Sequence, residues 1–251
     1  MPLTICEPVA IQLEAPIINE FKVHSTLPFL KNTKFSGRAG ILQDLCHFFL
    51  PSQLDKAVAT ERMVVVLHGM GGVGKTQIAL RFAHMHAESY ESIFWVDAKN
   101  KGTMETSCLH IVDRLIVHYA KKYQGFIPSD RYEQISIVLG VPGGILSTGT
   151  LVKNVESWEV VRQWFEKEEN TKWLLLVDNN DDQDVVQISG YLPACQWGSI
   201  LITSRNCSSH QYGKPFPVLL MGKEDGLKLL LTGAVREAED LPEEGQSDCL
   251  F

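Results

Sequence analysis

The sequence predicts an α/β fold in which helices cover both faces of a parallel sheet. Two observations carry this prediction. First, short runs of consecutive apolar residues alternate with longer stretches in which apolar residues recur at helical spacing. Uninterrupted apolar runs are typical of parallel strands that are buried on both faces. Second, a glycine-rich segment at 69–76 joins the first apolar run to a helical stretch, and alternation of strand and helix is the pattern of α/β proteins.

Residues 69–76 match the pattern of a phosphate-binding loop, G-x-x-x-x-G-K-[ST]. Glycines let backbone N–H groups curl round a polyphosphate, the lysine can reach its β and γ phosphates, and the last hydroxyl can ligate Mg²⁺. The apolar run 63–67 precedes the loop, and Ile78, Phe82 and Met85 follow it at helical spacing. This context favours phosphate binding over the alternative, a glycine turn between two core elements. The predicted binding residues are Gly69, Met70, Gly71, Gly72, Val73, Gly74, Lys75, Thr76 and Gln77.

The other elements follow from the same patterns. The chain begins with an irregular arm, 1–33, and a helix is predicted between Ser36-Gly37-Arg38 and Pro51, because proline ends a helical pattern. Further strands are predicted at 93–96, 173–178, 199–203 and 216–220. Further helices are predicted at 103–121, 132–139, 155–168 and 224–231, with a turn-rich, flexible loop at 141–150. The central domain thus spans 34–232, and the acidic tail at 233–251 is expected to be disordered.

Composition excludes several classes of function. Of 251 residues, 45% are hydrophobic and 21% are charged, as in an ordinary globular protein, and the net charge of −7 argues against a general affinity for nucleic acid. Six scattered cysteines without a C-x-x-C pair argue against a structural zinc site or a disulfide framework. The sequence shows no secretory signal and no apolar run of about 18 residues, so we expect a cytoplasmic protein without a membrane span.

Asp178 is the predicted metal-binding partner of the phosphate loop. It ends the apolar run 173–178, and in a parallel sheet ligands collect at the carboxyl ends of the strands, where the loop also begins. We therefore predict that Asp178 holds Mg²⁺, directly or through water, opposite the hydroxyl of Thr76. The alternative is an aspartate that only opens a turn after its strand.

Asn179 follows at the position where an ATPase often has a second acid. Because an amide cannot take a proton from water, Asn179 is a poor general base and any hydrolysis should be slow. Asp181 and Asp182 are the nearby candidates for catalysis, and solvated turn residues are the alternative reading of both.

Arg205 directly follows the fourth strand, in Thr203-Ser204-Arg205. At that strand end its cation can reach a γ-phosphate and report whether one is bound; the alternative is a surface arginine. Asp97, at the end of the second strand, is expected to cap or to pack. His84 and His86 lie two residues apart on a helix and so point in different directions, which argues against a metal pair.

Together these segments resemble the nucleotide-binding module of the NB-ARC type, within the STAND class of signalling ATPases. Apoptotic ATPases, plant disease-resistance proteins and many fungal receptor-like proteins share this module. The resemblance spans roughly residues 34–232, and the pair Asp178-Asn179 is most similar to the fungal members. The segments that carry it are Phe35-Ser36-Gly37-Arg38, residues 69–76, Phe94-Trp95-Val96-Asp97, residues 173–179 and residues 198–205.

The resemblance implies a P-loop NTPase sheet in strand order 5-1-4-3-2. It also implies a switch that holds ADP when off and exchanges it for ATP when on, with Mg²⁺ as the metal. Gly37 and Arg38 would lie near the adenine, although by themselves they indicate only a turn before a helix. The absence of an N-K-x-D guanine-reading motif agrees with adenine. Self-association through the nucleotide-binding domain is expected when ATP is bound.

Full members of the family continue into a helical bundle, a winged-helix domain and sensor repeats, and none of these follows Leu231 here. We therefore interpret the sequence as truncated after its nucleotide-binding core. It favours an ADP/ATP-binding switch that is at most a slow Mg²⁺-dependent ATPase. One alternative is an interaction scaffold that keeps the fold without binding nucleotide. The other is a small P-loop phosphotransferase, which would need a second basic cluster where residues 128–150 offer only Arg131.

Overall fold

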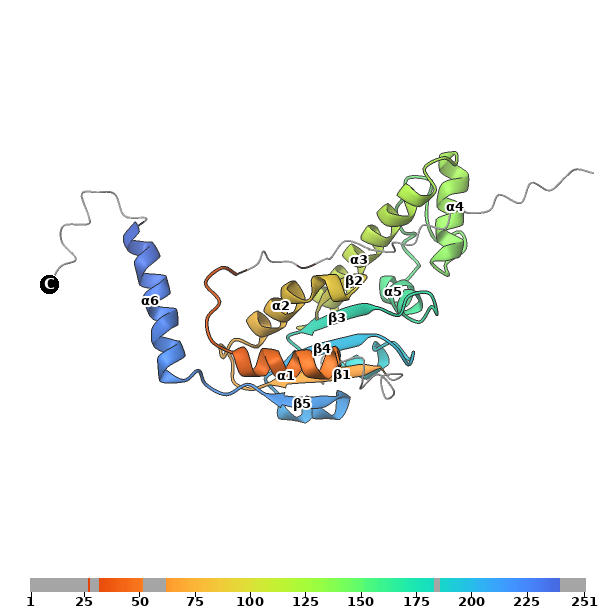
Figure 1. Ribbon diagram of the computed structural model, residues 1–251. Helices are drawn as coiled ribbons and strands as arrows, with labels where there is room; N and C mark the ends of the chain where they lie inside the picture. Colours follow the sequence, from red (N-terminus) through yellow and green to blue (C-terminus); the bar gives the residue numbers. More distant parts are fainter. Residues whose placement is uncertain (1–26, 28–31, 52–61, 183–185, 240–251) are drawn as a thin grey trace, which may run out of the picture.

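The computed structural model describes residues 27, 32–51, 62–182 and 186–239. A sheet of five parallel strands, in the order β2-β3-β4-β1-β5, lies at its centre with helices on both faces (Figure 1). The strands are β1 (Met63–His68), β2 (Ser92–Asp97), β3 (Trp173–Asp178), β4 (Ser199–Ser204) and β5 (Lys214–Pro217). The helices are α1 (Ala39–Phe49), α2 (Lys75–Met85), α3 (Lys101–Lys122), α4 (Pro128–Val138), α5 (Ser157–Phe165) and α6 (Lys223–Glu239), with 3₁₀ turns at Ala87–Ser89, Ile188–Gly190 and Cys207–Tyr212. The predicted fold class is confirmed, and the strand order is the predicted one counted from the other edge.

Alternation along the strands divides the core into two apolar clusters. In β1, Val65 and Leu67 pack with residues of α1 and α2, whereas Val64 and Val66 pack with residues of α3 and α5. Both faces of the strand are therefore withdrawn from water, which stabilises the fold by about 25 cal/mol for each Å² of apolar surface buried. This two-sided burial is the reason that the strands read as uninterrupted apolar runs.

Several element boundaries differ from the prediction. α3 begins at Lys101 rather than 103, because Asn100 and Thr103 exchange hydrogen bonds in a capping box just before it. α4 begins at Pro128 rather than 132, and proline suits the first helical position, where its missing N–H is not needed. α5 is shorter than the predicted 155–168 and ends at Phe165.

The fifth strand lies at Lys214–Pro217, two residues earlier than predicted. Its partner β1 ends at His68, whose carbonyl still accepts a hydrogen bond from the N–H of Val218 (2.7 Å). Beyond that point β1 turns into the phosphate loop, so Leu219 and Leu220 have no strand to pair with and are exposed. An apolar run thus extends past the end of the strand.

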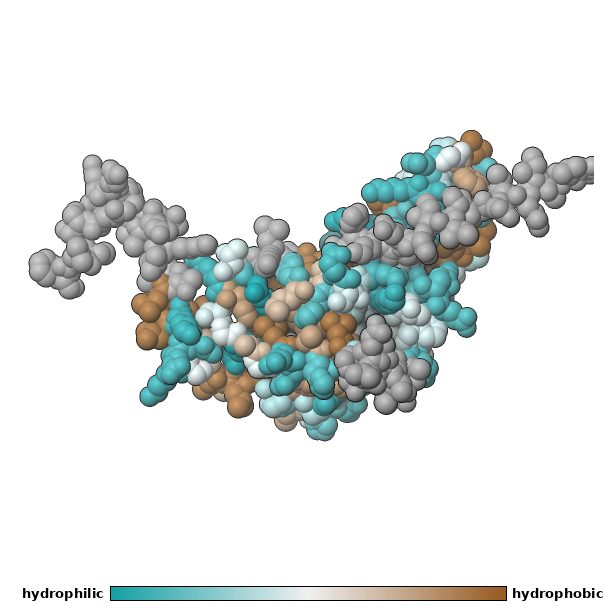
Figure 2. All heavy atoms as spheres, in the orientation of Figure 1, coloured by the Kyte–Doolittle hydropathy of each residue, from teal (hydrophilic) through white to brown (hydrophobic). Residues whose placement is uncertain are grey.

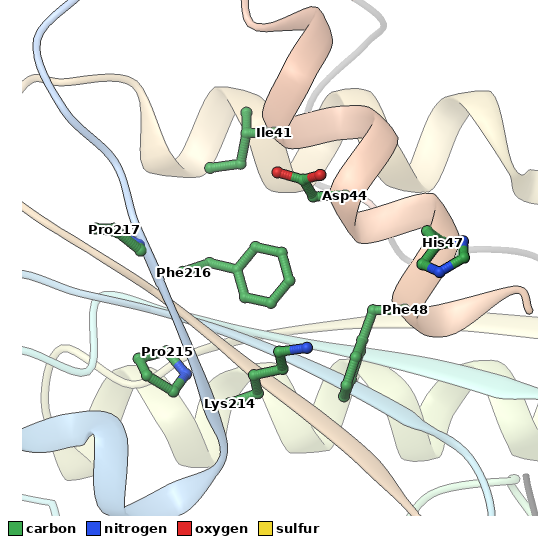
Figure 3. A pocket seen from close by; sticks show the side chains of 8 residues that line it. All are labelled: Ile41, Asp44, His47, Phe48, Lys214, Pro215, Phe216 and Pro217. Carbon is green, nitrogen blue, oxygen red and sulfur yellow. The ribbon is translucent and has the colours of Figure 1, made fainter. Parts of the chain in front are cut away.

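β5 forms one edge of the sheet, and a groove of about 650 Å³ lies between it and α1 (Figure 3). The ammonium of Lys214 lies there, 4.8 Å from the ring centre of Phe48. Because the N–H of Val218 points to β1, and residues alternate along a strand, the prolines at 215 and 217 face the free edge. Proline has no N–H, so this edge is poorly suited to adding another strand.

α6 projects away from the sheet and continues to Glu239 (Figure 1). The predicted helix ended at 231, so residues 233–239 of the predicted disordered tail are helical, whereas 240–251 and most of the predicted arm lie outside the described residues. Exposed leucines gather at the base of α6 (Figure 2), among them Leu227 and Leu230. In the described ranges, no helix combines the length and the apolar character needed to cross a membrane.

Candidate functional site

The phosphate loop joins β1 to α2, and its backbone has the shape that glycine permits. Gly69 has a φ of 150°, and a Cβ at this position would lie 2.5 Å from the carbonyl oxygen of Val218. Gly72 and Gly74 also have positive φ, and nothing lies within 4 Å of where their Cβ atoms would be. α2 begins directly afterwards at Lys75. The backbone N–H groups of the loop and the positive end of the α2 dipole therefore lie at the same place, where an anion would be stabilised. The loop therefore offers a cradle that fits a phosphate group.

The side chain of Lys75 lies over this loop. The residue is only 8% exposed, and its Nζ donates to the carbonyl oxygens of Gly69 (2.7 Å) and Met70 (2.8 Å). Burial lowers the pKa of Lys75, and Arg205 lowers it further, while the carboxylates of Asp181 and Asp178 act in the opposite direction. An anion bound in the loop would offset the cost of burying this cation.

Thr76 and Asp178 meet at the point where the sequence predicts a metal site. The Thr76 hydroxyl donates to Oδ1 of Asp178 at 2.8 Å, and the Thr203 hydroxyl donates to the same oxygen at 2.5 Å. Burial raises the pKa of Asp178, and the hydrogen bonds from Thr203 and Thr76 oppose that rise. A hydroxyl beside a carboxylate is an oxygen donor set of the kind that suits Mg²⁺, which keeps several waters and takes further ligands from phosphates. Across the described ranges, no group of three or more His, Cys, Asp or Glu side chains is arranged to hold a metal ion.

Asn179 is fixed between the ends of neighbouring strands. Its φ is 62°, a left-handed conformation that asparagine tolerates better than most residues. Its side-chain amide donates to Oδ1 of Asp97 at the end of β2 (3.1 Å), and its backbone N–H donates to the hydroxyl of Thr203 in β4 (3.1 Å). Asp97 thus acts as a structural acceptor, in line with the capping or packing role predicted for it.

A polar cavity of about 520 Å³ lies beside the loop and the strand ends. Within it, Asp181 accepts two hydrogen bonds of 2.6 Å from Arg205, one from the backbone N–H and one from Nε. The Cδ of Arg205 lies 3.5 Å from where a Cβ on Gly71 would be, so the arginine borders the loop. The cavity is lined by Gly71, Gly72, Gly74, Lys75, Thr76, Gln77, Lys99, Asn179, Asp181, Thr203 and Arg205.

A second cavity, of about 500 Å³, borders the same loop and is mainly apolar. Arg38 lies in its wall, where its guanidinium donates to the carbonyl oxygens of Val73 and Leu219 at 2.8 Å each. Gly37 has a φ of 68° and lies so close to Asp225 of α6 that a Cβ would be 2.6 Å from the carboxylate. The cavity is lined by Asn32, Lys34, Phe35, Ser36, Arg38, Gly72, Val73, Gly74, Gln77, Ile78, Leu220, Met221, Gly226, Leu229 and Leu230.

Residues 50–240 match the family model of the NB-ARC domain, which covers well over half of the chain. The chain belongs to the NB-ARC domain family. The resemblance inferred from the motifs is thereby confirmed, and membership of this P-loop NTPase family supports a nucleotide-binding signalling module. The family model begins at 50 rather than at the predicted domain start of 34, so the domain boundaries stay predictions.

This NB-ARC domain is similar to the following known proteins. A nucleotide-binding leucine-rich repeat (NLR)-like protein of Hyaloscypha variabilis is 26% identical over 241 residues, a match that covers 88% of this chain and 21% of that protein. The chain therefore spans about one fifth of that relative's length. The solved structure of the Aeropyrum pernix ORC2 protein in ADPNP-ADP complexes has 10% identity and a TM-score of 0.44, covering 85% of this chain and 55% of that one. That likeness is too distant to carry an argument about this domain.

The structure brings most of the predicted site residues of the NB-ARC domain together. The loop, Asp181 and Arg205 border the polar cavity, Asp178 lies behind it, and Arg38 borders the apolar one. Asp182 is exposed and does not line either cavity. The roles of all these residues stay predictions. Sequence reasoning missed Thr203 and Lys99, and the signal for Thr203 was a hydroxyl at the end of an apolar strand.

Proposed function

We propose that this chain is an adenine-nucleotide-dependent switch module that binds ADP and ATP with Mg²⁺ and hydrolyses ATP slowly or not at all. The observation that carries the proposal is the 2.8 Å hydrogen bond from Thr76 to Asp178. It joins the helix that follows the phosphate loop to the end of β3, so one hydroxyl and one carboxylate meet where a nucleotide-bound metal would lie. A loop that only turned the chain would not require this pairing.

The two cavities support a whole nucleotide rather than a lone phosphate. Both share Gly72, Gly74 and Gln77, so the loop separates a polar space from an apolar one. A nucleotide has the same division, because its phosphates are charged and its base is a flat ring with apolar faces. The apolar cavity would hold the base, and its position beside Gly37 and Arg38 agrees with the adenine site that the family resemblance implies.

Slow hydrolysis follows from the carboxylates near the polar cavity. Asn179 stands where a second acid would be expected, and its amide is bound to Asp97. Asp181 is the one carboxylate among the described residues that line the cavity, and both of its oxygens accept hydrogen bonds from Arg205. A carboxylate so engaged is a poor general base for an attacking water. If the Arg205 side chain turned to a γ-phosphate, as its predicted sensor role requires, Asp181 would lose the hydrogen bond from Nε and keep the one from the backbone N–H.

The two alternatives have less support. A phosphotransferase would need cations in a lid over an acceptor, but the guanidinium of Arg131 donates to the carbonyl oxygens of Tyr123, Gln124 and Phe126. Arg131 therefore binds backbone carbonyl groups just after the C-terminus of α3. A nucleotide-free scaffold would not need Lys75 over the phosphate loop or a hydrogen bond between Thr76 and Asp178. ATP-dependent self-association and a cytoplasmic location remain part of this proposal.

The test is to purify the chain, denature it and identify any released nucleotide by chromatography, then to measure ADP and ATP binding by calorimetry. We expect adenine nucleotide to bind the wild-type chain. In Lys75→Ala, the loss of a charge-assisted contact of about 1.5–3 kcal/mol should weaken affinity about tenfold or more. A folded wild-type chain that binds neither nucleotide would favour the scaffold. Unchanged affinity in Lys75→Ala would place the binding site elsewhere.

A further inference from the structure

Among the described residues, three cations line the polar cavity, and they differ in what they already bind. Lys75 donates to two loop carbonyls, and Arg205 is paired with Asp181. Lys99 is exposed, and its ammonium makes no hydrogen bond or ion pair with any residue in the part of the chain that the structure describes. This third cation is therefore available to a ligand without first giving up a partner.

The backbone that carries Lys99 is firmly placed. The N–H of Ala98 donates to the carbonyl of Asp178 (2.8 Å), and the N–H of Lys99 donates to Oδ1 of Asp97 (3.1 Å). One residue later, Asn100 caps the N-terminus of α3. Lys99 thus lies between the hydrogen-bonded end of β2 and the capped N-terminus of α3. Because its backbone is already ordered, little backbone entropy is lost when its ammonium binds a ligand.

The sheet order places Lys99 on the far side of the metal pair from the loop. The loop follows β1, Asp178 ends β3, and Lys99 follows β2, in a sheet ordered β2-β3-β4-β1. A diphosphate held by the loop and Lys75 lacks the third phosphate, so it offers one charged group fewer to a cation on the far side of the metal pair. A triphosphate has one more charged phosphate, and the cavity that extends to Lys99 is where it would be accommodated.

We propose that Lys99 is a specificity-determining residue that binds the γ-phosphate and so favours ATP over ADP. The inference rests on the proposed function, because it assumes that the polar cavity holds the phosphates of an adenine nucleotide. It adds to that function a residue that separates the two nucleotide states. The remaining explanation is a solvated surface lysine, whose charge would attract any nucleotide through the general field of the protein.

Lys101 provides the control for that explanation. It lies two residues further on, and its ammonium is 3.8 Å from Glu105, with 73% of its side chain exposed and no part in lining the cavity. Replacing either lysine with alanine removes the same charge from nearly the same place. Only replacement of Lys99 removes a cation from the cavity.

The experiment measures dissociation constants for Mg²⁺-ADP and for the non-hydrolysable analogue Mg²⁺-ADPNP by calorimetry, in the wild type, Lys99→Ala, Lys99→Arg and Lys101→Ala. In Lys99→Ala we expect ADPNP to bind about fivefold more weakly, equivalent to about 1 kcal/mol, with ADP unchanged within about twofold. Lys99→Arg should keep most of the preference, and Lys101→Ala should keep all of it.

Equal losses for both nucleotides in Lys99→Ala, or no loss for either, would overturn the inference and leave the proposed function standing. A loss of ADPNP affinity in Lys101→Ala as large as that in Lys99→Ala would also overturn it, because a general field would then explain the preference. A folded wild-type chain that binds neither nucleotide would overturn the proposed function and this inference together.

Discussion

Asp178 organises the site through a single oxygen. Its Oδ1 accepts hydrogen bonds from Thr76 of α2 and Thr203 of β4, so three elements meet at one carboxylate. Burial raises the pKa of this group, which means that its charge is costly without a cation nearby. A divalent metal would lower that cost, and this is the physical link between the buried aspartate and Mg²⁺.

Asp178→Asn should therefore separate metal binding from phosphate binding. The amide has nearly the same shape but carries no charge and is a weaker ligand for Mg²⁺. We expect ADPNP binding in the presence of Mg²⁺ to weaken about tenfold, a loss of about 1.4 kcal/mol, with a much smaller loss for ADP without metal. Calorimetry with and without Mg²⁺ measures both. The exposed Asp182→Asn is the control, and equal losses under the two conditions in Asp178→Asn would argue against a metal role.

Alanine substitutions at two nearby glycines, Gly37 and Gly40, should have opposite effects on the stability of the fold. Gly37 has a φ of 68° and abuts Asp225, whereas Gly40 lies in α1 with nothing within 4 Å of where its Cβ would be. Gly37→Ala should destabilise the fold by about 1–2 kcal/mol from left-handed strain, and Gly40→Ala should stabilise it by about 0.5 kcal/mol. Thermal unfolding would show a lower midpoint for the first and an unchanged or higher one for the second. The opposite order would mean that Gly37 does not hold a left-handed conformation in the folded chain.

At the scale of elements, burial decides what the sequence reveals. β3 and β4 are buried on both faces, so their apolar runs predicted them within a residue. The position of β5 depends on where its neighbour β1 ends, and this is a relation between strands that a local pattern does not contain. Sequence reasoning missed Lys99 for the same reason. Lys99 and the phosphate loop border one cavity only because β2 and β1 belong to the same sheet.

Tyr90 tests the burial of the segment that precedes β2. It precedes β2, is 6% exposed, and its hydroxyl lies 3.5 Å from the Ser199 hydroxyl of β4. Burial raises its pKa to about 12, so between about pH 10 and pH 12 the folded chain keeps a proton that the unfolded chain releases. Stability is then lost as pH rises through this window, by about 1.4 kcal/mol per pH unit.

The matched variant is Tyr90→Phe, which lacks the titrating proton and loses only a weak contact. We expect its denaturant-derived stability to fall less steeply than that of the wild type between about pH 10 and pH 12, with parallel curves below pH 9. Parallel curves throughout would show that the hydroxyl of Tyr90 ionises as readily in the folded chain as in the unfolded one.

On the scale of the whole molecule, distant parts of the chain build one site. The apolar cavity combines residues near Arg38, the phosphate loop, and the segment from Leu220 to Leu230, which includes the first turns of α6. The sequence motif identified the phosphate loop, because all of the residues that define it are consecutive in the chain. The α6 wall has no such signal: its leucines resemble an ordinary helix face, and only the three-dimensional arrangement turns Leu229 toward the loop's cavity.

Substitutions of Leu229 and Leu227 test whether α6 forms a wall of the base-binding cavity. Both lie on α6 and are partly exposed, but only Leu229 lines the apolar cavity. If the base packs there, Leu229→Ala removes apolar contact worth about 1 kcal/mol and should weaken ADP and ADPNP about fivefold each. Leu227→Ala should change neither. The equal loss for both nucleotides is essential, because the base is common to them, whereas a loss confined to ADPNP would place α6 near the phosphates instead.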